Sequence, residues 1–437
     1  MRLTVIGCGH LGATHAAGMA ELGHDVIGVD VDAAKVATLR TGRAWFQERG
    51  LDELLTRHTT TGRLRFTTDF AEAAAFGDVH FLGVGTPGLP GRDAYDLSQV
   101  YGAIRSLAPH LRRPCLIVGK STVSVGTTDE VAKLVRELAP AGTAVEVAWN
   151  PEFLREGFAV EDTLRPDRIV IGVRSAAAEK LLRELYAPIV DAGSPLIATD
   201  PASCELVKGA ANAFLTTKIS FINAVAELCD RVGADVSAVA EAIGYDARIG
   251  HRSLMPGLGY GGGCLPKDVR AFVARADELG VGEPLDFLRL VDAVNRRRRA
   301  HVVDLARQMC SGAVAYRRIA IWGASFKPGT DDIRDSPALE VASRLHAAGA
   351  DVTVYDPMAL DNARAAYPAL SYAYTAIDAS RDADLVVLAT DWDEFARTDP
   401  DVIGSVVAAR NLIDARNVIN LEWWRALGWT VRCLGRK

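Results

Sequence analysis

Arg2-Leu-Thr-Val-Ile-Gly7 runs directly into Gly7-Cys-Gly-His-Leu-Gly12, and the residues that follow are helical in pattern. The first run has the apolar character of a buried strand. In the second, Gly7 allows a tight turn, Gly9 lets the backbone approach a pyrophosphate, and Gly12 lets helix and strand pack closely. The phosphates would then lie at a helix amino terminus. The segment predicts a doubly wound α/β domain that binds a dinucleotide.

A second strand, Asp25-Val-Ile-Gly-Val-Asp30, ends in an acid where such domains bind the adenosine ribose. The carboxylate of Asp30 would accept hydrogen bonds from the ribose and repel a 2′-phosphate, which favours NAD over NADP. Lys35 works slightly against that preference. The cofactor contacts expected in this region are Gly7, Gly9, His10, Leu11, Gly12, Asp30 and Lys35.

One cysteine stands on a glycine-rich loop, Gly259-Tyr-Gly-Gly-Gly-Cys264-Leu-Pro-Lys-Asp268. The glycines permit positive φ angles and close approach of a ligand, and a cation next to a thiol favours the reactive thiolate. The alternative is a tight turn with a buried structural cysteine. Together with an oxidised nicotinamide, a reactive thiol indicates oxidation at the aldehyde level.

Composition excludes several other classes of protein. The 437 residues suffice for two or three domains. A net charge of −6 and a pI near 5.9 predict no general attraction to nucleic acid or membranes. The one basic run, residues 296–299, is interpreted as a solvated helix face, with anion binding as the alternative. No apolar stretch approaches the roughly 20 residues that span a bilayer, so we expect a cytoplasmic protein.

The seven cysteines are widely scattered and show no Cys-x-x-Cys pairing. Neither a disulfide framework nor a zinc site is indicated. No cluster of histidines or carboxylates has metal-ligand spacing either, and we expect no metal.

Three domains are expected: residues 1–198, 199–312 and 313–437. The first alternates helices with buried strands at 78–85, 115–119 and 145–148. Ligand contacts should come from the loops at the carboxyl ends of these strands. Those loops are Gly85-Thr-Pro87, Lys120-Ser-Thr122 and Asn150-Pro-Glu-Phe-Leu154.

The middle segment opens with Asp200-Pro201, an N-cap followed by a first-turn proline, and stays helical in pattern to Gly233. Such a helix, about 48 Å long, is too long for one small core. It carries an apolar stripe with a seven-residue spacing, namely Val207, Phe214, Phe221 and Leu228. We therefore predict a homodimer through this helix. Lys208 and Asn212 are four residues apart and point to one side.

The third segment begins again with a strand at 318–323, followed by strands at 351–356, 383–389 and 411–414. This order predicts a second doubly wound domain. Because it lacks the glycine triplet, its ligand should not be another whole dinucleotide. Lys327, Arg334 and Arg416 lie just past strand ends, where they could meet phosphates.

The chain as a whole resembles the nucleotide-sugar dehydrogenases, the UDP-glucose/GDP-mannose dehydrogenase family, in the pattern typified by UDP-glucose 6-dehydrogenase. The matching motifs, in order, are Gly7-x-Gly-x-x-Gly12, Gly85-Thr-Pro87, Lys120-Ser-Thr122, Asn150-Pro-Glu-Phe-Leu-Arg-Glu-Gly157, Glu205-Leu-x-Lys208-x-x-x-Asn212, the Cys264 loop, Phe326-Lys327 and Ile413-Asp-x-Arg416-Asn417. Eight motifs in order are far more specific than any one of them.

The resemblance implies an NAD-dependent, four-electron oxidation of a hexose C6 alcohol to a carboxylate, with a thiohemiacetal and then a thioester on Cys264. It implies oxyanion stabilisation by Lys208 and Asn212, a water held by Asp268 and Thr122, and Glu152 as the base for hydrolysis. Further cofactor contacts implied are Thr86, Thr122, Glu156, Lys267 and Arg334. Substrate contacts implied are Glu152, Phe153, Leu154, Lys208, Asn212, Tyr260, Gly261, Phe326, Lys327 and Arg416, with Arg248 reaching the site of the partner subunit.

Some positions depart from the family pattern. Gln47-Glu-Arg-Gly-Leu51 stands where Tyr-Glu-Pro-Gly-Leu is common, Gly263 replaces a serine, and Ala415 replaces a glycine. UDP-glucose is the expected substrate, with TDP-glucose and GDP-mannose as alternatives. Two other classes stay open. A one-step β-hydroxyacid dehydrogenase would not need Cys264, and a non-catalytic nucleotide-sugar sensor would keep the fold without the chemistry.

Overall fold

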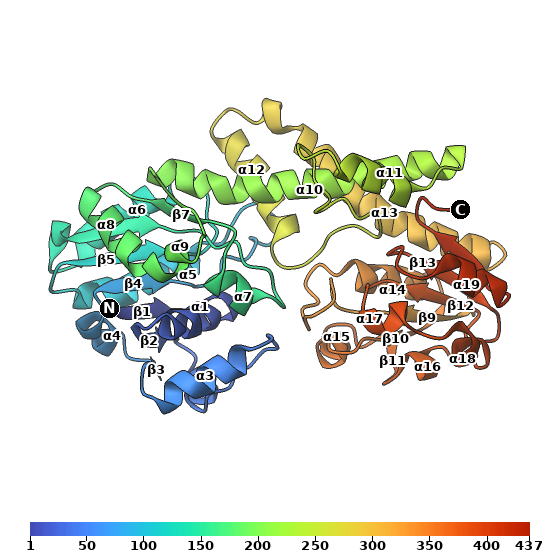
Figure 1. The fold of residues 1–437 in the computed structure, drawn as a ribbon, viewed down its shortest axis with the longest axis horizontal. Helices are drawn as coiled ribbons and strands as arrows, with labels where there is room; N and C mark the ends of the chain where they lie inside the picture. The colour runs from blue at the N-terminus through green and yellow to red at the C-terminus, as the bar shows by residue number, and fades with distance from the viewer. The chain divides into compact units, whose positions relative to one another are not determined.

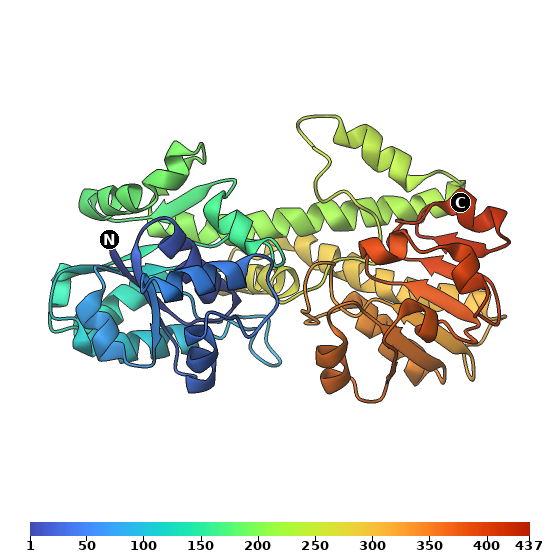
Figure 2. The same cartoon turned by 60° about the horizontal axis from the view of Figure 1, so that its bottom comes forward.

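A computed structural model describes all 437 residues and divides the chain into two compact units, Met1–Ala211 and Asn212–Lys437. Each unit contains one mainly parallel sheet between helices, as Figures 1 and 2 show for each half of the chain. The predicted fold class, two doubly wound domains linked by a long helix, is confirmed. No helix is both long and apolar enough to cross a membrane.

The first sheet has eight strands. Their order is β3 (Leu64–Thr67), β2 (Asp25–Val29), β1 (Arg2–Ile6), β4 (Val79–Leu82), β5 (Cys115–Gly119), β6 (Val145–Trp149), β7 (Ile169–Gly172) and β8 (Leu196–Thr199). All neighbours are parallel except β6 and β7. The chain order reverses between β1 and β4, and ligands of such sheets bind outside the carboxyl ends of the strands at that point.

Helices connect these strands. They are α1 (His10–Glu21), α2 (Ala33–Arg40), α3 (Leu51–Thr60), α4 (Phe70–Phe76), α5 (Ser98–Leu107), α6 (Thr127–Leu138), α7 (Ala159–Leu164), α8 (Ala176–Leu185) and α9 (Ala187–Asp191). Asp32 and Asp69 begin α2 and α4, since each carboxylate accepts from two first-turn N–H groups. The sheet is apolar on both faces: Leu3 and Val5 of β1 pack in one cluster and Ile6 in another.

Helix α10 (Pro201–Val232) is continuous, as predicted, and begins where Asp200 accepts a hydrogen bond from the Ser203 N–H at 2.9 Å. The boundary between the two units falls within this helix. It is followed by α11 (Val236–Gly244), α12 (Leu265–Glu278) and α13 (Phe287–Met309).

The second sheet has six parallel strands. Their order is β11 (Ser371–Tyr372), β10 (Asp351–Tyr355), β9 (Arg318–Trp322), β12 (Leu385–Leu388), β13 (Asn411–Asp414) and β14 (Thr430–Cys433). The helices of this part are α14 (Pro337–Ala347), α15 (Leu360–Ala366), α16 (Ala376–Ala379), α17 (Asp393–Ala396), α18 (Pro400–Gly404) and α19 (Leu421–Ala426). All the strands predicted from the sequence are present, whereas β3, β7, β8, β11 and β14 were not predicted.

The interpretation of residues 296–299 as a solvated face is wrong for two of the four arginines. Arg296 and Arg297 are exposed, but Arg298 and Arg299 are buried, at 0% and 3% exposure. The helical period explains the difference: both lie on the inner face of α13, in line with the buried Asn295 one turn earlier.

Buried His80 of β4 predicts a specific loss of stability in acid. Burial lowers its pKa from 6.5 to about 3, and the ring hydrogen bonds the Thr4 hydroxyl at 2.7 Å. In the unfolded chain His80 therefore binds a proton near pH 6.5, whereas in the folded chain it stays neutral down to about pH 3. The free energy of unfolding is therefore at its full value above pH 6.5 and decreases as the pH falls toward 3. By about pH 5 this amounts to roughly 2 kcal/mol.

His80→Gln should remove this component, because glutamine does not titrate. Denaturant unfolding of both proteins at a series of pH values between 8 and 5 measures it. Equal pH dependence of wild type and variant would contradict the assignment to His80.

Candidate active site

The glycine-rich turn after β1 has the geometry of a phosphate site. A Cβ added at Gly12 would lie 1.7 Å from the Gly7 carbonyl oxygen, so only glycine allows α1 to pack there. At Gly9 an added Cβ would meet nothing within 4 Å, which leaves that side open. No side chain caps α1. Its first N–H groups can therefore receive a phosphate.

A cleft of about 610 Å³ adjoins this turn. Asp30 lines it, and its carboxylate is oriented by the N–H groups of Cys8 at 2.8 Å and Asp32 at 2.9 Å. Lys35 lines the same cleft, with its ammonium group 4.6 Å from the centre of the Trp45 ring. The residues present therefore fit the adenosine end of a dinucleotide.

Trp45 was not predicted to take part in this site. Its indole N–H donates to the Cys8 carbonyl at 3.3 Å, which fixes the ring against the glycine-rich turn. Glu48, from the loop that departs from the family pattern, accepts from the N–H groups of Gly157 at 2.8 Å and Ala159 at 2.9 Å. That loop thus packs on the segment that contains Glu156. No motif in the sequence assigned a role to the aromatic pair Trp45-Phe46.

The loops after β4 and β5 are joined by side chains. The Thr86 hydroxyl donates to the Thr122 carbonyl at 2.8 Å. The Ser121 hydroxyl donates to the Val84 carbonyl at 2.6 Å. Thr86 and Thr122 therefore lie together at the carboxyl edge of the sheet, as predicted for ligand-binding loops.

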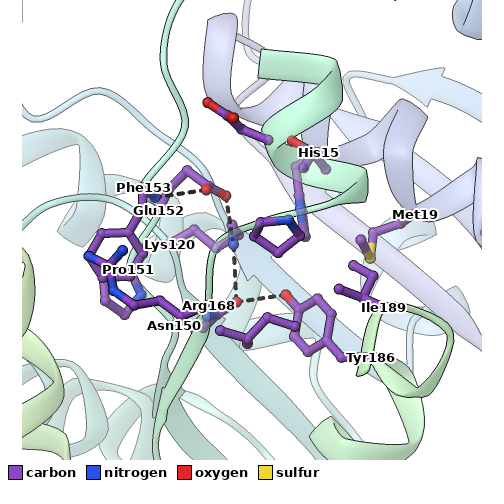
Figure 3. A pocket seen from close by; sticks show the side chains of 14 residues that line it. His15, Met19, Lys120, Asn150, Pro151, Glu152, Phe153, Arg168, Tyr186 and Ile189 are labelled. Carbon is purple, nitrogen blue, oxygen red and sulfur yellow. Dashed lines mark hydrogen bonds and ion pairs between the residues drawn. The ribbon is translucent and has the colours of Figure 1, made fainter. Parts of the chain in front are cut away.

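Glu152 lies in a buried polar cluster (Figure 3). One carboxylate oxygen accepts from the backbone N–H groups of Phe153 at 2.8 Å and Leu154 at 3.1 Å. The other lies 3.0 Å from the ammonium group of Lys120, which also donates to the Asn150 side-chain oxygen at 3.0 Å. Burial opposes the charge on Lys120, but the attraction of Glu152 outweighs it and raises the pKa of the lysine. Lys120 is therefore charged at neutral pH although it is buried.

The cluster extends to Tyr186, whose hydroxyl donates to the same Asn150 oxygen at 2.6 Å. Tyr186 was not predicted as part of this cluster, because it lies 36 residues from Asn150 and no motif marks it. Lys120 was noted only as part of a loop motif.

Lys208 of α10 is buried, with its ammonium group 5.3 Å from the centre of the Phe153 ring. Glu205, one turn earlier, accepts from the N–H groups of Gly126 at 2.7 Å and Thr128 at 2.6 Å. Glu205 thus caps the amino end of α6, which lacks a local cap. This contact holds the first turns of α10, and with them Lys208, against the first sheet.

In the second unit, Cys264 is the N-cap residue of α12 and is exposed. A helix amino terminus stabilises a thiolate. Asp268, four residues further, is fully buried and accepts from the Asn212 amide at 2.6 Å and from the Lys267 ammonium group at 2.6 Å. The second unit therefore brings Cys264, Lys267, Asp268 and Asn212 together. Tyr260 and Gly261 lie on the same loop, and the Tyr260 ring is buried.

Arg416, after β13, donates to three backbone carbonyls. They belong to Ala389 at 2.8 Å, Gly259 at 3.2 Å and Phe326 at 3.3 Å. Lys327 extends over the Phe326 ring. A Cβ added at Gly263 would lie 2.3 Å from the guanidinium carbon of Arg334, so this arginine lies directly on the cysteine loop.

The acid that ends β10 in the second sheet occupies the position corresponding to Asp30, but its environment differs. One oxygen of Asp356 accepts from Ala324 and Ser325 N–H groups at 2.8 and 2.9 Å, and from the Trp392 indole at 3.1 Å. Its other oxygen accepts from two further N–H groups. Both oxygens of this carboxylate are therefore hydrogen-bonded within the domain itself.

Arg248 extends from an exposed loop, with its side chain 89% exposed and paired with Asp246 at 2.6 Å. Within its own chain it lies on the surface.

Three family models match consecutive parts of the chain. They are described as the NAD-binding, central and UDP-binding domains of the UDP-glucose/GDP-mannose dehydrogenase family, and they match residues 1–190, 202–297 and 320–421. A protein from Rhizobium meliloti named UDP-glucose 6-dehydrogenase is 42% identical, with 100% of both chains covered. One of the same name from Pseudomonas aeruginosa is 39% identical, covering 100% of this chain and 98% of its own.

Solved structures are similar as well. A UDP-glucose dehydrogenase from Pyrobaculum islandicum has a TM-score of 0.91 and 39% identity, with 97% of this chain and 96% of the other covered. A UDP-D-ManNAc dehydrogenase from Pyrococcus horikoshii has a TM-score of 0.87 and 28% identity, with coverage of 100% and 99%.

The remaining six cysteines contrast with Cys264. Burial raises the pKa of each of their thiols, to about 11 for Cys115 and to about 12 for Cys204 and Cys433. They are therefore protonated at neutral pH, and five of them are buried.

Iodoacetamide at about pH 7.5 should alkylate a single thiol per native chain, that of Cys264, because only this one is both exposed and at a helix amino terminus. Intact-mass and peptide mass spectrometry measure the number and position of the adducts. Cys264→Ser should take up none. Alkylation of Cys115 before Cys264 would contradict the assignment of Cys264 as the reactive thiol.

Proposed function

Because the chain belongs to the UDP-glucose/GDP-mannose dehydrogenase family, we propose that it oxidises UDP-glucose to UDP-glucuronate with NAD. The observation that carries the proposal is full-length similarity to relatives named UDP-glucose 6-dehydrogenase. The geometry agrees with it, since the first unit has a dinucleotide cleft and the second displays Cys264 on a helix amino terminus. We assign NAD binding to residues 1–198, dimerisation to 199–312 and nucleotide-sugar binding to 313–437.

The reaction removes two hydrides from one carbon. NAD, held by the residues of the first cleft, would supply the hydride acceptor for each oxidation step, so two NAD are needed per sugar. The C6 alcohol first loses a proton and a hydride and becomes an aldehyde. The thiolate of Cys264 adds to that aldehyde, and loss of the second hydride turns the thiohemiacetal into a thioester. Water then displaces the cysteine and releases the carboxylate.

Lys208 and Asn212 stabilise the oxyanion that develops at C6. This role is supported by their burial and by their spacing of one turn on α10. We propose that Asp268 holds the water that receives the first proton, a role that the family resemblance gives to Thr122 as well. The amide of Asn212 and the ammonium group of Lys267 hold the Asp268 carboxylate in a fixed orientation.

Glu152 directs the water that hydrolyses the thioester. Three donors, two backbone N–H groups and Lys120, occupy most of its acceptor sites and leave room for about one more hydrogen bond. Its carboxylate can thus accept a single water in a fixed direction.

NADH formed per sugar tests the proposed function. With limiting UDP-glucose run to exhaustion we expect two NADH per molecule, and none with GDP-mannose or UDP-N-acetylhexosamines; TDP-glucose is run beside them. Cys264→Ser should stop the reaction short of the carboxylate, because a hydroxyl is a much weaker nucleophile than a thiolate. Absorbance at 340 nm and sugar analysis give the ratio.

One NADH per sugar with aldehyde accumulating would contradict the covalent step. Near-normal two-step turnover by Cys264→Ser would do the same. No NADH with any nucleotide hexose would favour a sensor.

We also propose a homodimer through α10. Three side chains of the predicted stripe are exposed within the chain: Phe214 by 67%, Phe221 by 57% and Leu228 by 62%. Large apolar side chains in such a row usually meet a partner. Arg248, which is exposed and pairs with Asp246 within its own chain, is proposed to reach the partner's substrate. The unpaired state of all seven cysteines supports a reducing, cytoplasmic location.

Mixing two inactive variants tests whether Arg248 acts across the dimer. Arg248→Ala and Cys264→Ser homodimers should each have little activity. Heterodimers contain one complete site, the cysteine from one subunit and the arginine from the other. Unfolding and refolding an equal mixture should thus restore about a quarter of wild-type activity. No recovery, with dimers present by light scattering, would contradict the assignment of Arg248.

A further inference from the structure

The backbone just before the nucleophile is held by a side chain of α13. The carboxamide of Asn295 binds Tyr260 twice: its oxygen accepts from the Tyr260 N–H at 2.8 Å, and its nitrogen donates to the Tyr260 carbonyl at 3.0 Å. Asn295 is almost fully buried. A buried carboxamide engaged at both ends fixes the position of the peptide that it binds.

Neighbouring side chains extend this contact. Arg299, one turn further along α13, donates to the Tyr260 carbonyl at 3.0 Å and pairs with Asp335 at 2.7 Å and with Glu340. Its charge is therefore balanced although it is buried.

The start of the loop is held at Gly257 from two helices. Arg298 donates to the Gly257 carbonyl at 3.2 Å, and Asn223 of α10 accepts from the Gly257 N–H at 2.8 Å.

The glycines of the loop make this approach possible. Gly259 has a φ of +98°, and a Cβ there would lie 2.2 Å from the Asn295 side-chain oxygen. Any side chain at this position would push the carboxamide away. The glycine pattern of the sequence therefore serves a close contact with α13 as well as access for a ligand.

We propose that Asn295 is a positioning residue for the reaction: it fixes the Tyr260 peptide and thereby holds Cys264, four residues later, where its sulfur meets the aldehyde. This inference rests on the proposed role of Cys264. A displacement of about 1 Å in a reacting group can reduce the rate roughly 100-fold. A rigid backbone at Tyr260 therefore affects the rate although Asn295 does not contact the substrate.

Asn295→Leu removes both hydrogen bonds at similar volume, and Arg297→Gln, an exposed neighbour on the same helix, is the matched control. In Asn295→Leu we expect kcat to fall roughly 100-fold and the NAD constant to change far less, because the glycine turn and Asp30, which hold the adenosine end, lie in the first unit. We also expect NADH per sugar to fall from two toward one as aldehyde escapes. This ratio is independent of the fraction of folded enzyme, so general destabilisation would not change it.

Hydrogen–deuterium exchange provides a readout that does not need activity. Amides of residues 257–264 should exchange at least tenfold faster in Asn295→Leu, while those of residues 1–30 and the Arg297→Gln control should match wild type. A ratio that stays at two, or unchanged exchange of the loop, would overturn the inference.

If Asn295→Leu does not fold, Asn223→Ser tests the same loop at Gly257 with the same two measurements. If wild type itself makes no NADH, the proposed function fails, and exchange in the loop then decides alone whether Asn295 holds it.

Discussion

The parallel pairing of strands decides where the cofactor cleft and the Lys120–Glu152 pair of this chain lie. Parallel strands all end at one edge of their sheet, so consecutive strand ends bring residues far apart in sequence into contact there. In the first sheet the edge holds the glycine turn after β1, Asp30 after β2 and Thr86 after β4. Lys120 and Glu152 follow β5 and β6. One topological rule thus assembles a cofactor cleft and a carboxylate with its counter-ion.

The same rule gives different chemistry in the two sheets, because side chains decide what a strand end can bind. Asp30 is held by two N–H groups and borders an open cleft. Asp356, at the corresponding place, accepts from backbone and indole donors that fill both of its oxygens. A carboxylate so fully occupied is a structural anchor. The second domain thus has the architecture of a dinucleotide domain, but its corresponding carboxylate is occupied by the protein's own donors.

The parts of this structure that depend on local pattern were predictable from the sequence. The helix that begins at Pro201 follows from its N-cap residue and from the helical spacing of its apolar residues. The central strands of both sheets follow from short apolar runs. Short edge strands such as β11, which has two residues, carry no comparable signal. Arg298 and Arg299 could not be interpreted from charge alone, since their partners, the Gly257 carbonyl and Asp335, lie about forty residues away. Tyr186, which binds Asn150 across 36 residues, is a similar case.

Helix α10 places three polar side chains on one face at a spacing that the helix itself sets. Glu205 caps α6, Lys208 lies one turn later, and Asn212 binds Asp268 one turn after that. These three side chains recur at intervals of three and four residues and so share one face, while Phe214, Phe221 and Leu228 form a separate exposed row. One face of a single helix therefore carries Glu205 and Lys208, which belong to the first unit, and Asn212, which belongs to the second. The spacing between Lys208 and Asn212 is fixed by the helix pitch, which no loop could hold as firmly.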